Sequence, residues 1–173
     1  MNIDLLITEP LQPRSGDILT SSLLVFSFGI TYDTEMDNII IDTNVLLAAL
    51  RSQKGASYKL LTLVRSKKFC LHLSVPLFVE YESVCKREQH ALDAETVDDI
   101  LNYLALVGNK HDIFYLWRPI LKDPKDDHVL ELAVKSNSQF IITFNKRDFV
   151  GTESFGIRIA SPLEYLQHLG EIK

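Results

Sequence analysis

The feature that most constrains this chain is a run of three isoleucines, residues 39–41, that leads directly into Asp42. A short run of β-branched apolar residues is typical of a strand that is buried on both faces of a parallel sheet. Helical spacing of apolar residues follows at once and continues to Leu50. Asp42 should therefore lie where a central strand ends and a helix begins. In open α/β sheets ligands bind at that edge, so Asp42 is either a site residue or a helix N-cap.

Beyond Asp42 the sequence alternates between strand-like and helix-like segments. Further strands are predicted at residues 69–73, 113–116, 140–144 and 157–159. Helices are predicted after Asp42, over residues 56–65, from Ser74 to about Arg87, from residue 93 or 94 to near Gly108, from Asp123 through Val134, and from Ser161 through Leu169. Such alternation implies the α/β class, with a mainly parallel sheet between layers of helices.

The first 37 residues do not share this alternation. They contain two β-prone segments, residues 3–7 and 23–30, on either side of a polar stretch with Pro10, Pro13 and Gly16. We therefore divide the chain into an N-terminal extension, residues 1–37, and an α/β domain, residues 38–173. The two β-prone segments could form a hairpin or an edge strand, or could be loosely attached. The extension could also be the product of a start assigned too far upstream, since Met36 would be a natural start for the domain.

The composition is that of an ordinary globular protein, with 46% hydrophobic and 24% charged residues. The net charge of −5 excludes general electrostatic attraction to nucleic acid, so a nucleic-acid function would need local basic residues or a metal ion. The two cysteines are predicted to be reduced and buried, and the five histidines show no zinc-site spacing. Without a targeting or membrane-spanning segment, we expect a cytoplasmic protein.

Several other acidic residues decide whether Asp42 belongs to a site. Glu80 shares a helix face with Leu77 and Val84, where an unpaired carboxylate is costly. We therefore expect Glu80 either to pair with a lysine or to contact a metal ion.

Three acids crowd one predicted helix start. Asp123 is the expected N-cap, with Pro124 at the first helical position. Asp126, one turn further, would face the strand ends. Asp127 would point elsewhere, because adjacent helical residues diverge by about 100°.

Asp148 follows the predicted strand at residues 140–144 after a short turn, and is either a site acid or an ordinary turn residue. Within that turn Asn145 offers a neutral oxygen ligand, and Lys146 and Arg147 form a small basic rim.

Each acid alone has a structural explanation, but together they place carboxylates at two strand ends and near two helix starts. Carboxylates held together repel one another unless a cation neutralises them. Oxygen ligands without cysteine suit Mg²⁺ or Mn²⁺, which activate water for displacement at phosphorus. We therefore infer phosphodiester hydrolysis as the reaction class.

Four motifs in the same order resemble those of the PIN-domain family, in particular its VapC-like group of toxins from toxin–antitoxin systems. The motifs are IIIDTN at residues 39–44, SVPLFVEYE at 74–82, DPKDDHVLELA at 123–133 and IITFNKRDF at 141–149. The resemblance implies a three-layer α/β/α sandwich. It also implies a Mg²⁺- or Mn²⁺-dependent endoribonuclease acting on single-stranded RNA, usually a homodimer, that a small antitoxin protein inhibits.

The resemblance also assigns residues. Asp42, Glu80 and Asp126 match the family's first three acids, while Asn145 stands where many relatives have a fourth and Asp148 is the nearest carboxylate. The predicted catalytic and metal-binding set is Asp42, Glu80, Asp126 and Asp148, supported by Thr43, Asn44, Thr143 and Asn145, with Arg51, Lys146 and Arg147 contacting RNA.

Two other interpretations remain open from the sequence. Asn145 is compatible with a non-catalytic PIN-like binding module that has lost full metal affinity. Alternatively, the acids all act as caps in a structural α/β domain, in which case replacing Asp42 would change stability alone.

Overall fold

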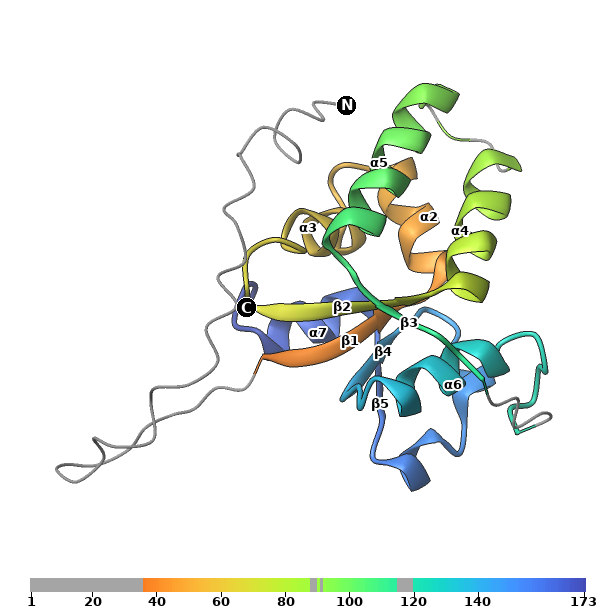
Figure 1. Ribbon diagram of the computed structural model, residues 1–173. Coiled ribbons are helices and arrows are strands. Elements are labelled where there is room, and N and C mark those ends of the chain that lie inside the picture. The colour runs from red at the N-terminus through yellow and green to blue at the C-terminus, as the bar shows by residue number, and fades with distance from the viewer. Residues whose placement is uncertain (1–35, 88–89, 91, 115–119) are drawn as a thin grey trace, which may run out of the picture.

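The computed structural model describes residues 36–87, 90, 92–114 and 120–173. Its described strands form one parallel sheet in the order β3-β2-β1-β4-β5 (Figure 1). The central strand β1 (Asp37–Ile41) pairs with β2 (Phe69–Ser74) on one side and with β4 (Phe140–Ile142) on the other. The outer strands are β3 (Asn109–His111) and β5 (Arg158–Ala160). The predicted α/β fold with a mainly parallel sheet is thus confirmed.

Helices cover both faces of the sheet (Figure 1). One layer contains α2 (Thr43–Arg51), α3 (Ala56–Thr62), α4 (Val75–Arg87) and α5 (Ala94–Val107). On the opposite face α6 (Asp127–Lys135) packs against β1, β2 and β4. The last helix, α7 (Pro162–His168), contacts α3 and β5. None of the helices in the described part of the chain is both long enough and apolar enough to cross a bilayer.

The isoleucine run lies at the centre of the core. Ile39, Ile40 and Ile41 are at most 4% exposed, as expected for a strand that is covered on both faces. Tyr81 of α4 is also buried, and its hydroxyl donates to the carbonyl oxygen of Ile41. This bond joins the end of β1 to α4, the helix that carries Glu80.

Two helices that were predicted to start near residue 93 and at Ser161 begin there, each with a capping residue. Asp93 caps α5 by accepting a hydrogen bond from the Thr96 amide at 2.8 Å. Ser161 and Glu164 form a capping box at the start of α7. Both cysteines are free, but only Cys85 is buried, because Cys70 is partly exposed.

The predicted strand at residues 113–116 is wrong. The third strand is β3, four residues earlier, and Ile113 and Phe114 follow it without regular structure, while residues 115 and 116 lie outside the described residues. Gly108 explains the shift, since a Cβ there would lie 2.6 Å from Leu73 Cδ1. The backbone therefore packs against β2 directly after α5 ends, and residues 109–111 pair with β2 as strand β3.

The proposed hairpin at residues 3–7 and 23–30 lies outside the described residues. The described strands, the core that they form with the described helices and all four predicted acids lie within residues 36–173. We expect a chain that starts at Met36 to unfold cooperatively, with a midpoint within about 3 °C of the full chain's. Thermal unfolding followed by circular dichroism tests this, and loss of the cooperative transition would show that the first 35 residues complete the core.

Candidate metal centre

The sheet has a switch point between β1 and β4. The chain passes from β1 to β2 and β3 on one side, and then to β4 and β5 on the other. In open parallel sheets the crevice beyond the carboxyl ends of two such strands is the usual ligand site. Asp42 directly follows β1 and Thr143 directly follows β4, and the Asp42 amide donates to the Ile142 carbonyl at 2.9 Å. Asp42 therefore lies at the switch point.

The Asp42 carboxylate is buried and held from one side. Its Oδ2 accepts hydrogen bonds from Thr143 Oγ1 at 2.5 Å and from Asn44 Nδ2 at 2.6 Å. Asn44 Nδ2 also donates to Thr143 Oγ1 at 3.1 Å. The predicted supporting residues Asn44 and Thr143 thus contact Asp42 directly. Although Asp42 occupies the N-cap position of α2, its side chain makes no capping hydrogen bond, which argues against a purely structural role.

Burial raises the pKa of Asp42, and the negative charge of Glu80 raises it further. Hydrogen bonds from Thr143 and from the Thr43 backbone act in the opposite direction, as does the nearby His128. The Thr43 hydroxyl is itself buried. A buried carboxylate under these opposing influences is typical of a functional site. Its ionised form becomes more favourable when a cation is present.

Asp126 lies among the other acids. Burial and the charges of Asp42, Asp123, Asp148 and Glu80, in that order, raise its pKa to about 6. The other three predicted acids, Asp42, Glu80 and Asp148, therefore all lie within electrostatic range of Asp126. Asp123 is also close enough to Asp126 to raise its pKa, whereas the sequence predicted Asp123 only as a helix N-cap.

The predicted helix start at Asp123 and Pro124 is wrong. α6 begins at Asp127, and Asp126 takes the N-cap position without a side-chain capping bond. Asp123 instead closes a separate turn, because its Oδ1 accepts from the Lys125 amide at 3.0 Å. Three acids within five residues each suit a cap, so the sequence did not distinguish among them.

The Asp127 side chain points toward the segment that precedes α6, in line with its predicted divergence from Asp126. It is 1% exposed, and its Oδ1 accepts a hydrogen bond from the Leu121 amide at 2.8 Å. The Ile120 amide lies 3.3 Å from the same oxygen. Asp127 thus connects the start of α6 to the segment that precedes it, a structural function.

Glu80 has a histidine partner that the sequence analysis missed. Its Oε2 lies 3.0 Å from His128 Nε2, while His128 Nδ1 lies 2.7 Å from the Lys125 carbonyl oxygen. The Glu80 side chain is 36% exposed, so it is not enclosed by its apolar helix neighbours. The only sequence signal for His128 is its place two residues after Asp126.

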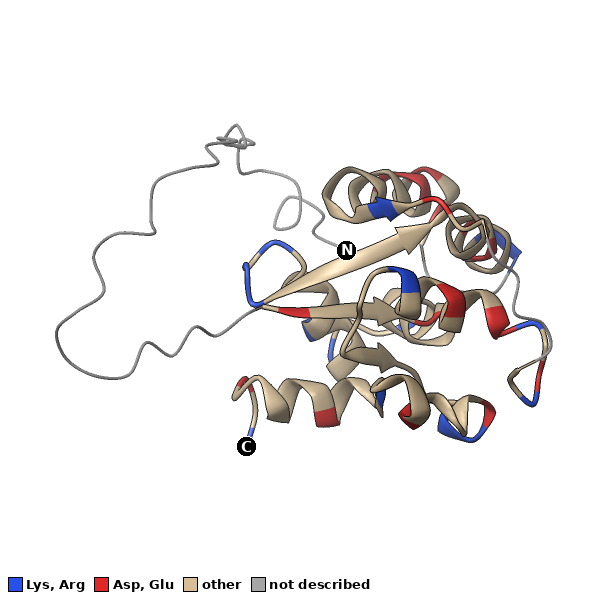
Figure 2. Ribbon diagram, turned by 60° about the horizontal axis from the view of Figure 1, so that its bottom comes forward, with Lys and Arg blue, Asp and Glu red and all other residues tan. Residues whose placement is uncertain are grey.

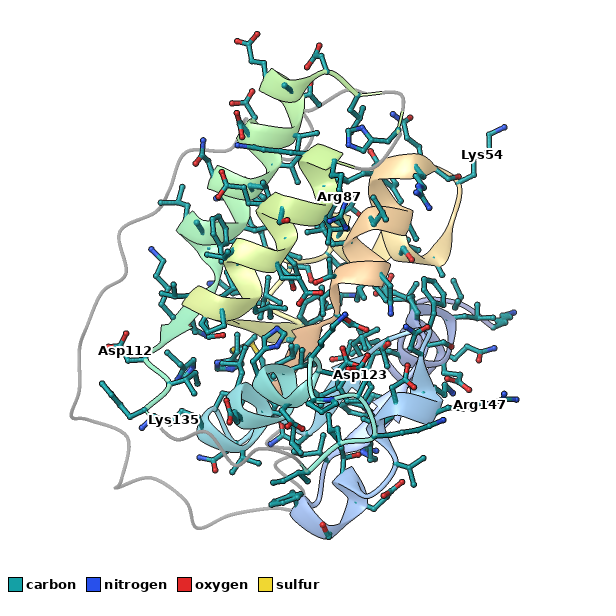
Figure 3. All side chains as sticks on the ribbon, turned by 90° about the vertical axis from the view of Figure 1, so that its right-hand side faces the viewer. Lys54, Arg87, Asp112, Asp123, Lys135 and Arg147 are labelled. Atoms are coloured by element: carbon teal, nitrogen blue, oxygen red, sulfur yellow. The ribbon has the colours of Figure 1, made fainter. Side chains whose placement is uncertain are left out.

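Four more predicted residues, Asn145, Lys146, Arg147 and Asp148, follow the end of β4. Asp148 belongs to a short 3₁₀ helix, η1 (Lys146–Phe149), and the Asn145 amide donates to Thr143 Oγ1 at 2.9 Å. Lys146 pairs with Glu164. Figure 3 looks onto the carboxyl edge of the sheet, with Asp123 near the middle of the view and Arg147 pointing outward at its margin.

Arg51 lies at the opposite end of α2 from Asp42. It ends α2, and its backbone is about 12 Å along the helix axis from Thr43. More generally, Lys and Arg are spread over several elements and interleaved with Asp and Glu (Figure 2). In this view the described Lys and Arg residues are scattered along the ribbon and do not gather in one place.

The site fits a divalent cation by its chemistry. Within the described ranges, no three His, Cys, Asp or Glu side chains are arranged to hold a metal ion, so the acids must rotate to share one. The donors are nevertheless carboxylate oxygens, and burial together with the neighbouring negative charges raises the pKa of Asp126. Such a set suits Mg²⁺ or Mn²⁺.

A family model described as PIN domain matches residues 38–147. The match covers more than half of the chain, so this protein belongs to the PIN-domain family. PIN domains are generally nucleases and typically use divalent metal ions. The matched range includes Asp42, Glu80, Asp126 and Asn145, and ends one residue before Asp148. A search of curated proteins found no match.

The raised pKa of Asp126 predicts a pH-dependent stability. Because its folded-state pKa is about 6, above the ordinary 3.8, the stability that its protonation provides is lost as pH rises through about 6. Asparagine cannot ionise, so Asp126→Asn should raise the thermal midpoint of the metal-free protein more at about pH 7.5 than at about pH 4.5. Thermal unfolding in chelator tests this, and equal gains at both pH values would contradict it.

Proposed function

We propose that this PIN-domain protein is a Mg²⁺- or Mn²⁺-dependent endoribonuclease that hydrolyses phosphodiester bonds in single-stranded RNA. The observation that carries the proposal is the buried Asp42 carboxylate at the switch point, electrostatically coupled to Glu80 and Asp126. The VapC-like sequence motifs support a further step, in which the protein is the toxin of a toxin–antitoxin pair.

Asp42, Glu80, Asp126 and Asp148 would hold the cation. A bound divalent ion supplies Lewis-acid stabilisation of phosphate oxygens and a water of lowered pKa. Thr143 and Asn44 both bind Oδ2 of Asp42, and this fixes the orientation of the whole carboxylate, including Oδ1. Asn145, whose amide is bound to Thr143, would place a neutral oxygen at the same edge.

An exposed aromatic residue beside these acids supports a single-stranded substrate. Phe144 is 52% exposed, and its backbone amide donates to Asn44 Oδ1 at 3.2 Å. An exposed ring on a fixed backbone is suited to stack on an unpaired base, which a duplex does not offer. Arg147, and less directly Lys146 and Arg51, would contact the RNA backbone.

The proposed protein partners are a second copy of the chain and a small antitoxin. Val75 and Val79, one turn apart on α4, are 68% and 56% exposed. Large exposed apolar side chains on one helix face are suited to protein contact. Light scattering of the purified chain would test for a homodimer, and a short reading frame beside the gene would support the antitoxin.

Cleavage of a labelled single-stranded RNA pool by the purified full chain tests the main proposal. We expect cleavage with Mn²⁺, none with chelator, and little cleavage of a perfect duplex of the same sequence. Restoration of cleavage by added Mn²⁺ would exclude damage by the chelator.

A second candidate function is a non-catalytic PIN-like RNA-binding module. Asn145 in place of a fourth acid favours it, as does the lack, among the described residues, of three side chains arranged around an ion. Calorimetric titration with Mn²⁺ separates the two functions. A module would bind RNA without a Mn²⁺ site and without cleavage.

A further inference from the structure

His128 and Glu80 bring two metal-ligand atoms together beside the acids. His128 is the second residue of α6, Glu80 lies in α4, and His128 Nε2 is 3.0 Å from Glu80 Oε2. Around an octahedral ion with bonds of about 2.1 Å, neighbouring ligand atoms are about 3.0 Å apart. The two atoms thus already have the spacing of one edge of such a coordination shell.

The other ring nitrogen of His128 fixes the orientation of the imidazole. Nδ1 lies 2.7 Å from the Lys125 carbonyl oxygen. A carbonyl only accepts hydrogen bonds, so Nδ1 carries a hydrogen whether the ring is charged or neutral, and a cation that displaced the Nε2 hydrogen would meet a lone pair beside Glu80. A backbone carbonyl behind the ring is the usual way in which a metal-ligating histidine is oriented.

His128 is also close to the predicted metal ligands. It lies two residues after Asp126, and its charge opposes that of Glu80 in shifting the pKa of Asp42. Since His128 is only 8% exposed, the ring has little freedom to leave this position. An ion shared by Asp42 and Glu80 would therefore meet the imidazole.

We propose that His128 Nε2 is a direct nitrogen ligand of the divalent cation, next to Glu80, and that it favours Mn²⁺ and later transition metals over Mg²⁺. The inference rests on the proposed metal-dependent function. Mg²⁺ takes oxygen ligands, whereas imidazole suits transition-metal ions. One nitrogen ligand among carboxylates would thus set metal preference without changing the reaction.

Pulsed electron paramagnetic resonance on the full chain loaded with Mn²⁺ tests the ligand directly. A coordinated imidazole should add ¹⁴N modulation to the Mn²⁺ signal, and His128→Gln should remove it. His168→Gln is the matched control, because His168 lies on α7 and its ring bonds to Asp37. By calorimetry, His128→Gln should weaken Mn²⁺ binding by about tenfold or more and Mg²⁺ binding much less.

The outcomes separate this inference from the proposed function. Mn²⁺ binding that depends on Asp42 but shows no ¹⁴N modulation in the wild type would overturn the ligand role, leaving His128 and Glu80 as a structural pair. Absence of any Mn²⁺ binding would overturn both proposals. The wild-type spectrum does not depend on how a variant folds, and His128→Asn gives a second variant if His128→Gln does not fold.

Discussion

Replacing Asp42 by asparagine should reduce Mn²⁺-dependent cleavage of single-stranded RNA by more than about 100-fold, beyond the 10–100-fold that loss of an orienting partner costs. Asparagine has nearly the shape of aspartate, and its amide oxygen can still accept from Thr143 and Asn44. What it lacks is the negative charge of the buried carboxylate. Rates measured over a range of Mn²⁺ concentrations would show this loss, and a wild-type rate would remove Asp42 from the site.

The same variant should remain folded. Burial and Glu80 raise the pKa of Asp42, so the ionised carboxylate is unfavourable in the metal-free protein. Asp42→Asn should therefore have an unchanged or higher thermal midpoint in chelator. Asp93→Ala is the matched control, since Asp93 caps α5 through Thr96. It should lose about 1 kcal/mol of stability and keep its cleavage rate. Loss of stability in Asp42→Asn with an unchanged cleavage rate would favour the interpretation of Asp42 as a helix cap.

The sequence was sufficient to predict the central strand and the class of fold. Three consecutive isoleucines leave no polar face, so only a position between two helical layers buries them. The same run predicts the place of Asp42, because the residue after a central parallel strand must emerge at the carboxyl edge of the sheet. These inferences depend on local pattern alone.

Features that depend on neighbouring segments were not predicted. The edge strand β3 consists of Asn109, Lys110 and His111, and has no hydrophobic alternation because it is only partly covered. The contact of His128 with Glu80 joins α6 to α4 and follows from how these helices pack. The first residue of α6, Asp127, accepts a hydrogen bond from the Leu121 amide, which no capping pattern reveals.

Asp127→Ala should destabilise the fold by about 2–3 kcal/mol, the largest stability loss that we expect from a single acid. The Leu121 amide is buried and donates to Asp127 Oδ1, so alanine would leave this donor without its charged acceptor. Asp127→Asn is the matched control, because the amide oxygen can take the place of Oδ1 and should retain most of the stability. Urea denaturation of the three proteins in chelator measures the difference. Equal losses in the two variants would show that charge, and not the hydrogen bond, is what Asp127 provides.

Asp148→Ala should impair metal binding and leave the stability nearly unchanged, the converse of the effect of Asp127→Ala. Asp148 lies close enough to Asp126 to raise its pKa, whereas Asp127 is not among the groups that do so. Removing Asp148 should therefore weaken Mn²⁺ binding and RNA cleavage, by about tenfold, while the midpoint of unfolding changes little. The loss should be smaller than for Asp42→Asn, because water can replace a peripheral ligand.

Mn²⁺ titration and cleavage assays on Asp148→Ala and Asp127→Ala, at a temperature where both are folded, should show a clearly larger loss for Asp148→Ala. Equal effects would remove Asp148 from the metal site and leave Asn145 as the predicted oxygen ligand beyond β4.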